Sequence, residues 1–214
     1  MRHQIPRIYI ISDRLIAGGS VAMLEAFRCI AAALPPGAMA VQIREKDLGP
    51  RDVVALARHA VESLAPWNVP VLVNDRFDLA VASGAAGVHL SSAGISPGEV
   101  RRVYEGIIAI STHSSADLAG LDPNDVDFAV FGPVFDTPSK RSFGPPLGME
   151  AVCKAVDGSP VPILALGGIH PGNAHLLAGI GIAGIAMISA VLCAPDPAHA
   201  ACVIADAAFP SGDR

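Results

Sequence analysis

The sequence predicts an α/β protein, a (β/α)8 TIM barrel that forms a single domain over residues 1–214. Eight apolar runs of strand length recur along the chain, and alanine-rich or amphipathic segments lie between them. The runs are apolar at nearly every position, which is typical of parallel strands that are covered by helices. Eight such units favour a closed barrel, and a doubly wound open sheet is the weaker alternative.

The predicted strands are rich in Val, Ile and Ala, and Gly, Pro, Asn or Asp flank most of them. Their length is that of ordinary buried strands. In chain order they span residues 8–12, 38–44, 70–75, 87–90, 107–111, 128–134, 162–168 and 184–189.

Helices are predicted where apolar residues recur three or four positions apart. This spacing is clearest over residues 21–34, 51–65 and 173–181. A chain of 214 residues is short for this fold, so the helices after the third and fourth strands, at 77–84 and 96–106, must be brief. No linker, low-complexity tract or basic tail marks a second domain.

The composition argues against several classes of protein. Hydrophobic residues make up 51% of the chain and charged residues 16%, which indicates buried strands rather than disorder. The formal net charge of -5 gives no global electrostatic reason to bind nucleic acid or an anionic membrane, so we expect neither as a partner. Any anionic ligand must therefore be held by a local group of residues.

The cysteines and the first residues bear on the compartment. Cys29, Cys153, Cys193 and Cys202 lie far apart and form no CxxC pair, so we expect reduced thiols and a cytoplasmic protein. The first residues contain only a four-residue apolar run, too short for the core of a signal peptide. No stretch reaches the roughly 18 consecutive apolar residues, free of charge, that span a membrane.

Polar residues of the predicted strands gather at their carboxyl ends, where barrel enzymes have their working residues. Buried polar groups are costly unless partnered, so a ring of them at one end of a barrel is better explained by a ligand than by folding. Single members also have ordinary explanations, such as a surface ion pair between Arg44 and Glu45, or a helix cap for His113. The ring comprises Gln42, Arg44, Glu45, Lys46, Asn74, Asp75, Arg76, His89, Ser111, Thr112, His113, Thr137, Ser139, Lys140, Arg141, Gly167, Gly168 and Ser189.

Three cations and two hydroxyls of this ring suit a phosphate group, because ammonium and guanidinium groups supply charge and hydroxyls supply oriented donors. They are Arg44, Lys46, Lys140, Thr137 and Ser139. We therefore expect small-molecule phosphates or pyrophosphates as ligands.

Two further features predict a second anion site and a metal. Gly167 and Gly168 follow the seventh strand, where glycines expose backbone N–H groups to an anion. Two anion sites would make this a two-substrate cavity. Asp75 is a candidate Mg²⁺ ligand, because Mg²⁺ commonly binds one or two carboxylates together with phosphate oxygens.

Six segments, spread from the second predicted strand to the eighth, are highly specific in combination: VQIREKDL, VLVNDRFDLAVASGAAGVHL, ISTHS, FGPVFDTPSK, LALGGI and GIAMISAV. Their order and spacing resemble the family of thiamine-phosphate synthase and its close relative, thiazole tautomerase. The resemblance implies a (β/α)8 barrel that joins a pyrimidine pyrophosphate to a thiazole phosphate, with Mg²⁺, and releases pyrophosphate.

The resemblance also implies roles for individual residues of this chain. It implies that Gln42 contacts the pyrimidine, and that the pyrophosphate is held by Arg44, Lys46, Asn74, Ser111 and Lys140. The thiazole phosphate would be held by Thr137, Ser139, Gly168, Ile188 and Ser189. We take the catalytic set to be Arg44, Lys46, Ser111, His113 and Lys140.

The implied reaction needs neither a Ser-His-Asp set nor a cysteine nucleophile. Departure of pyrophosphate would give a resonance-stabilised pyrimidine carbocation, which the thiazole nitrogen then captures. Catalysis would be mostly electrostatic, because cations stabilise the leaving group while the barrel positions the second ring.

One position departs from the family pattern. In synthases the GVHL strand is followed by Gly-Gln and then by an aspartate that is the second Mg²⁺ ligand, whereas this chain reads HLSSAGIS, with Gly94 at that position. A synthase could use Asp75, pyrophosphate oxygens and water instead. A tautomerase needs proton transfer and no pyrophosphate, so it would tolerate the loss and use His113 as its acid or base.

We favour the synthase, because the set Arg44, Lys46, Asn74 and Lys140 is complete and a tautomerase has no evident use for it. The alternatives are the tautomerase and a binding or regulatory protein that holds a thiamine-related phosphate without turnover. The sequence leaves open the oligomeric state, including a homo-oligomer, and the order of the loop at 135–147 without ligand.

Overall fold

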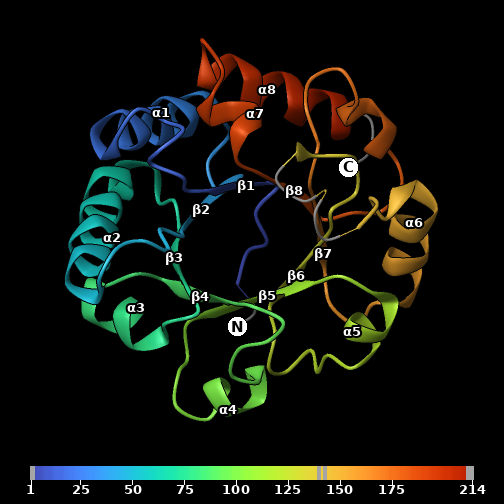
Figure 1. Cartoon of the computed structure of the whole chain (residues 1–214), viewed down its shortest axis with the longest axis horizontal. Helices are drawn as coiled ribbons and strands as arrows, with labels where there is room; N and C mark the ends of the chain where they lie inside the picture. Colours follow the sequence, from blue (N-terminus) through green and yellow to red (C-terminus); the bar gives the residue numbers. More distant parts are fainter. Residues whose placement is uncertain (1–2, 139–140, 142–143, 211–214) are drawn as a thin grey trace.

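The structure is a computed structural model that describes residues 3–138, 141 and 144–210. Within these residues, eight strands form a closed parallel barrel in chain order, and β8 pairs with β1 to close it. Helices surround the barrel (Figure 1). The predicted (β/α)8 barrel is therefore confirmed.

The strands match the predicted apolar runs and are mostly shorter by one or more residues. Pro133 has no backbone N–H to donate to the sheet, so the sixth strand ends at Phe131 and the prediction of a strand to residue 134 is wrong. The strands are β1 (Ile8–Ile11), β2 (Met39–Ile43), β3 (Val71–Asn74), β4 (Gly87–Leu90), β5 (Ile107–Thr112), β6 (Phe128–Phe131), β7 (Ile163–Leu166) and β8 (Gly184–Met187).

The helices after the third and fourth strands are brief, as the chain length requires. The full set is α1 (Ser20–Ala33), α2 (Pro50–Leu64), α3 (Phe77–Ser83), α4 (Pro97–Arg101), α5 (Ser115–Ala119), α6 (Gly148–Gly158), α7 (Ser189–Leu192) and α8 (Pro197–Ala208), with the 3-10 helices η1 (Ala65–Trp67) and η3 (Ala174–Leu177). The last helix, α8, packs against both α1 and η3.

The α-helix predicted over 173–181 is wrong, because only the short η3 forms there. Gly179 and Gly181 have φ angles of 71° and 84°, in the left-handed region that an α-helix does not use. The apolar spacing is real, since Ala174 and Leu177 are buried, but the glycines end the helix after one turn.

Alternation along the strands divides the core into two parts. On β1, Ile8 and Ile10 face the helices, while Tyr9 and Ile11 face the barrel interior. Among the inner neighbours of Tyr9 is Phe128, whose ring lies edge-on to the tyrosine ring. The barrel is therefore filled by side chains, and its interior is not a channel.

Within the described part of the chain, no helix is both long enough and apolar enough to span a membrane. The four cysteines are free thiols.

Candidate active site

The barrel interior changes from apolar to polar at the carboxyl ends of β2 to β5. Because side chains alternate along a strand, each residue two positions after an inward-facing one faces inward as well. Ala40, Leu72, Gly87 and Ala109 are such inward-facing positions on β2 to β5. The residues two positions later are polar and lie at the carboxyl side of the apolar interior: Gln42, Asn74, His89 and Ser111. These four members of the sequence-predicted ring therefore lie at the same mouth of the barrel.

A short chain of hydrogen bonds runs along the ends of β2 and β3. The Nε2 atom of Gln42 donates to Oδ1 of Asn74 at 3.0 Å, and Nδ2 of Asn74 donates to Oδ2 of Asp75 at 2.7 Å. Gln42 is only 1% exposed, yet its Oε1 atom has no hydrogen-bond partner among the described residues. A buried acceptor without a partner is costly, so this amide suits a ligand that brings a donor.

Asp75 has an unusual backbone conformation that fixes its carboxylate. Its φ angle is 58°, and its backbone N–H donates to the carbonyl of His89 at 2.8 Å. The carboxylate accepts one hydrogen bond on each oxygen, from Asn74 and from the backbone N–H of Ser91. Each oxygen keeps a free lone pair, so the carboxylate can still bind a cation.

Gly94 lies directly against this carboxylate. A Cβ atom at Gly94 would lie 3.4 Å from Oδ1 of Asp75 and 3.2 Å from Oγ of Ser91. No group of three or more metal-binding side chains occurs within the described residues, so Asp75 is not part of a larger cluster. A single carboxylate fits a Mg²⁺ ion that takes its other ligands from phosphate and water.

The two cations after β2 lie beside Asn74 and Asp75. Arg44 and Lys46 help to line a cavity of about 220 Å³ together with these two residues. The predicted pyrophosphate-binding residues of β2 and β3 are thus adjacent in space.

Glu45, between the two cations, points away from them. It is 7% exposed, and its carboxylate accepts hydrogen bonds from Oγ of Ser12 at 2.6 Å and from the backbone N–H of Arg14 at 3.1 Å. Its ion-pair partner is Arg14 at 3.3 Å, so the suggestion of an Arg44–Glu45 surface pair is wrong. Arg14 also pairs with the exposed Asp47.

This network also fixes Arg44. The backbone N–H of Arg44 donates to Oγ of Ser12 at 2.7 Å, while the same hydroxyl donates to Glu45. The loop after β1 and the end of β2 are therefore held together, with the Arg44 side chain left at the cavity.

The loops after β6 and β7 meet at Gly168. Its φ angle is 66°, and a Cβ atom there would lie 2.5 Å from the carbonyl oxygen of Asp136. The backbone N–H of Phe135 donates to the carbonyl of Gly167 at 3.0 Å. Thr137 follows in the same loop, so it and Gly168 belong to neighbouring segments.

The remaining predicted residues of this half lie on β8 and beyond. Ile188 precedes α7 and Ser189 is its first residue, and β8 pairs with β7. The predictions for Ser139 and Lys140 lie outside the described residues.

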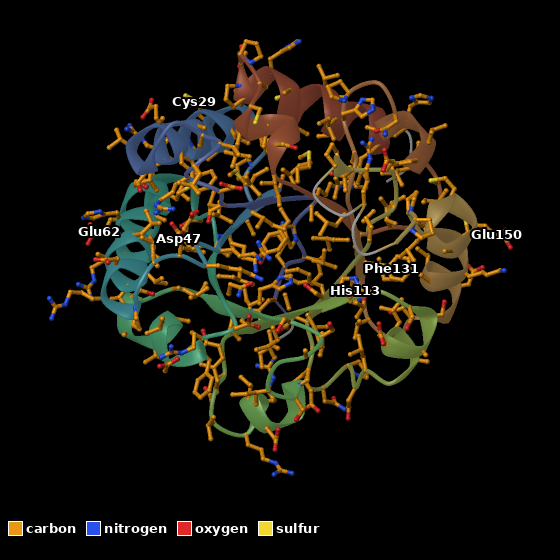
Figure 2. The ribbon with its side chains drawn as sticks, in the orientation of Figure 1. Cys29, Asp47, Glu62, His113, Phe131 and Glu150 are labelled. Atoms are coloured by element: carbon orange, nitrogen blue, oxygen red, sulfur yellow. The ribbon has the colours of Figure 1, made fainter. Side chains whose placement is uncertain are left out.

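His113 is held by the backbone of the next strand. Its Nδ1 atom donates to the carbonyl oxygen of Gly132 at 2.7 Å, and Figure 2 places it near Phe131, at β5 and β6. Ser114, rather than His113, caps α5, so the helix-cap explanation of His113 is wrong. Its Nε2 atom is not used in this hydrogen bond.

Sequence reasoning missed a buried pair beneath the mouth, Tyr9 and His89. The hydroxyl of Tyr9 lies 3.2 Å from Nδ1 of His89, and Nε2 of His89 lies 2.8 Å from Oγ of Ser111. Burial lowers the pKa of His89 to about 3 and raises the pKa of Tyr9 well above its usual value. The sequence had placed His89 in the polar ring, but nothing in the sequence paired it with Tyr9.

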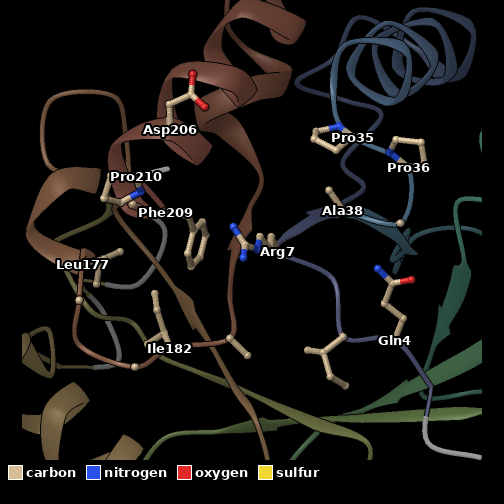
Figure 3. Close-up of a pocket in the computed structure, with 16 residues that line it drawn as sticks. Gln4, Arg7, Pro35, Pro36, Ala38, Leu177, Ile182, Asp206, Phe209 and Pro210 are labelled. Atoms are coloured by element: carbon tan, nitrogen blue, oxygen red, sulfur yellow. The ribbon is translucent and has the colours of Figure 1, made fainter. Parts of the chain in front are cut away.

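A larger cavity, of about 790 Å³, opens at the opposite end of the barrel (Figure 3). Its lining includes Arg7, Ala38 and Ala183, which directly precede β1, β2 and β8. The Arg7 guanidinium already lies over the ring of Phe209, 5.3 Å from its centre. Convergence of polar side chains, and not cavity size, therefore places the candidate active site at the carboxyl end.

Comparisons with known proteins identify the family of the chain. Residues 8–191 match the family model described as thiamine monophosphate synthase. The chain is 37% identical over 203 residues to a thiamine-phosphate synthase from Albidiferax ferrireducens, and the alignment covers 94% of this chain and 91% of the relative. It is 36% identical over 206 residues to a thiamine-phosphate synthase from Leptospira biflexa, and this alignment covers 94% of this chain and 96% of that relative.

Solved structures give the same fold. A thiamine phosphate pyrophosphorylase from Pyrococcus furiosus superimposes with a TM-score of 0.82 at 25% identity, over 97% of this chain and 96% of that one. A 3-hexulose-6-phosphate synthase superimposes with a TM-score of 0.69 at 13% identity, over 94% of this chain and 99% of that one. The second likeness concerns the fold alone.

Proposed function

This chain belongs to the thiamine monophosphate synthase family, and from that premise we propose that it joins hydroxymethylpyrimidine pyrophosphate to thiazole phosphate and releases pyrophosphate. It is an enzyme of the thiamine-phosphate synthase type, a transferase of thiamine biosynthesis. The observation that carries the proposal is the grouping of Arg44, Lys46, Asn74 and Asp75 around one cavity at the carboxyl end of the barrel. A tautomerase, which handles no pyrophosphate, has no use for that grouping.

The reaction breaks the bond between the pyrimidine methylene carbon and the pyrophosphate oxygen, and the electron pair leaves with the pyrophosphate. Arg44 and Lys46 stabilise the charge that develops on this leaving group, in a site where the surrounding dipoles are already oriented. The thiazole nitrogen then forms the new bond to the carbon. The barrel contributes by holding the two rings close together and correctly aligned.

Gln42 is the residue best suited to contact the pyrimidine ring. Its unpartnered Oε1 atom accepts a hydrogen bond from an amino group on the ring, while its Nε2 atom remains bound to Asn74. The ligand thereby supplies the partner that the buried amide lacks. Asn74 in turn helps to orient Asp75.

The thiazole phosphate belongs at the other side of the mouth. The close approach of the loops after β6 and β7 at Gly168 leaves room only for a residue without a side chain there. Backbone N–H groups beside such a glycine can approach a phosphate closely. Thr137, Ile188 and Ser189 complete this half of the site together with Ser139, as the family resemblance implies, whereas Lys140 belongs with the pyrophosphate.

Asp75 fits a Mg²⁺ ion, since its carboxylate is fixed and keeps free lone pairs. Mg²⁺ supplies positive charge to the pyrophosphate when it is bound. The residues of this chain orient the carboxylate through Asn74 and through the backbone of Ser91.

Turnover measured with and without Mg²⁺ tests the proposed function. Thiamine phosphate should form from the two substrates in Mg²⁺ and should not form in EDTA, because the leaving pyrophosphate then lacks the positive charge that Mg²⁺ supplies. His113→Ala should change the rate only modestly. Isomerisation of thiazole phosphate in EDTA, abolished by His113→Ala and without any thiamine phosphate, would instead identify a tautomerase.

Gly94→Asp should tighten the apparent affinity for Mg²⁺ by about tenfold, which is about 1.4 kcal/mol. The new carboxylate extends from a Cβ position only 3.4 Å from Oδ1 of Asp75, and the Ser91 hydroxyl must shift slightly. The measurement is the Mg²⁺ concentration that gives half-maximal rate.

Gly94→Asn is the matched control, because it adds nearly the same volume without the charge. It should leave the Mg²⁺ dependence close to that of the unchanged enzyme. Equal effects of the two substitutions would show that Gly94 does not stand at a metal-ligand position.

The wider setting of the enzyme is also a proposal. We propose a single domain over residues 1–214, and the free thiols support a cytoplasmic location. Its ligands are small phosphate and pyrophosphate compounds. Size measurement in solution would decide whether it forms a homo-oligomer.

A further inference from the structure

A buried series of hydrogen bonds between side chains connects the barrel core to the candidate site. It runs from the hydroxyl of Tyr9 to His89 and from His89 to Ser111, with distances of 3.2 Å and 2.8 Å. Tyr9 is 0% exposed and His89 is 2% exposed, whereas Ser111 is half-buried at the end of β5. This series of hydrogen bonds therefore leads from the closed interior toward the mouth of the barrel.

The direction of the first hydrogen bond follows from the surroundings of Tyr9. Among the described residues, Nδ1 of His89 is the one hydrogen-bond partner of the Tyr9 hydroxyl. If this hydroxyl accepted a proton from Nδ1, its own proton would point at apolar neighbours such as Phe128 and lack an acceptor. Leaving a buried donor unsatisfied costs about 1–3 kcal/mol, so Tyr9 donates.

The position of the His89 proton follows in turn. Nδ1 accepts from Tyr9, so it carries no proton, and a neutral imidazole then has its single N–H on Nε2. A doubly protonated ring is disfavoured by the same argument, because it would again leave the Tyr9 proton without an acceptor. The Nε2–H group donates to Oγ of Ser111.

We propose that Tyr9 and His89 are positioning residues that fix the hydroxyl of Ser111 as a donor to an anion at the barrel mouth. The Ser111 oxygen accepts from the deeper His89, so its own proton points away from the interior. Without this series of hydrogen bonds the hydroxyl could turn and donate to His89, presenting its oxygen to the anion instead. The role of Ser111 toward pyrophosphate rests on the proposed function, but the direction of the hydrogen bonds does not.

Nitrogen NMR of the histidine rings tests the direction without any ligand. In protein labelled with ¹⁵N at histidine, His89 should show a protonated Nε2 and an unprotonated Nδ1 at neutral pH. Loss of one ring signal in His89→Gln assigns it. His113 is an internal control, because its Nδ1 donates to the carbonyl of Gly132, so its neutral ring should show the opposite tautomer.

Binding of inorganic pyrophosphate in the presence of Mg²⁺ tests the consequence. Tyr9→Phe removes one hydroxyl and keeps the ring beside Phe128, so the fold should remain and His89 should populate both tautomers. We expect the Kd measured by calorimetry to rise by about tenfold in Ser111→Ala, and by a smaller factor in Tyr9→Phe. A melting curve accompanies each variant.

The double variant Tyr9→Phe with Ser111→Ala distinguishes an effect of Tyr9 on the Ser111 hydroxyl from a general disturbance of the binding site. If Tyr9 acts through Ser111, its substitution should have no further effect once the hydroxyl is gone. Additive effects on the Kd, or a wild-type His89 that is protonated on Nδ1, would overturn the proposal. The wild-type protein could instead show the expected His89 tautomer but fail to bind pyrophosphate. That result would reject the proposed function and the donor role of Ser111, and it would still support the direction of the hydrogen bonds.

Discussion

Arg44→Ala is expected to lower kcat/KM for thiamine phosphate formation by about 10²–10³, because it removes one pre-oriented charge from the developing pyrophosphate. Arg44 is half-buried beside Asn74 and Asp75, and its backbone is fixed by the Ser12 hydroxyl. The backbone from which the guanidinium extends is therefore fixed beside the cavity before the substrate binds. Steady-state kinetics with both substrates, beside a melting curve, measure the effect.

Two further variants sharpen this result. Arg44→Lys keeps the charge but loses the planar pair of donors, so it should recover part of the lost rate. Arg28→Ala removes an arginine that forms an exposed ion pair with Glu25 on α1, and it should leave the kinetics unchanged. Unchanged turnover in Arg44→Ala would reject the assignment of this cavity to pyrophosphate.

Glu45→Ala should lower the free energy of unfolding by about 3 kcal/mol, because it removes the acceptor of several groups that are shielded from water. Ser12 and the backbone N–H of Arg14 lose their partner, and the Arg14 guanidinium keeps only the exposed Asp47. For a domain of this size, the melting temperature should fall by roughly 6–12 °C. Thermal unfolding followed by circular dichroism measures it.

Asp47→Ala provides the matched control for Glu45, since both carboxylates pair with Arg14. The Asp47 side chain is 52% exposed, so its removal should destabilise the fold far less than the removal of Glu45. A Glu45→Ala variant no less stable than Asp47→Ala would contradict a structural role for the buried carboxylate.

The strands were predictable because each combines continuous apolar character with flanking turn residues. Gly87–Leu90 occupies the range that the sequence predicted, since every residue of β4 is buried. The end of β6 and the segment at 173–181 were not predictable from apolar spacing. In both places the apolar side chains continue the pattern of a strand or a helix, but the backbone of proline or glycine ends the element.

The polar ring at the strand ends was predictable as a set, because parallel strands of a barrel end at one mouth. The direction of each side chain was not. Glu45 and Lys46 are adjacent charged residues in the sequence, yet the Glu45 carboxylate is buried against the loop after β1 while Lys46 is exposed. The partner of Glu45, Arg14, lies 31 positions earlier, so only the folded chain brings the two charges together.

The contact between Arg7 and Phe209 has a practical consequence for handling this enzyme. It joins the segment before the first strand to the end of the last helix, at the end of the barrel remote from the candidate active site. An affinity tag, a fused domain or a surface tether attached before Arg7 or after Phe209 would therefore leave substrate access free. Both attachment points also lie on the same side, so an immobilised enzyme would present the mouth with the candidate active site to the solution whichever terminus carried the tether.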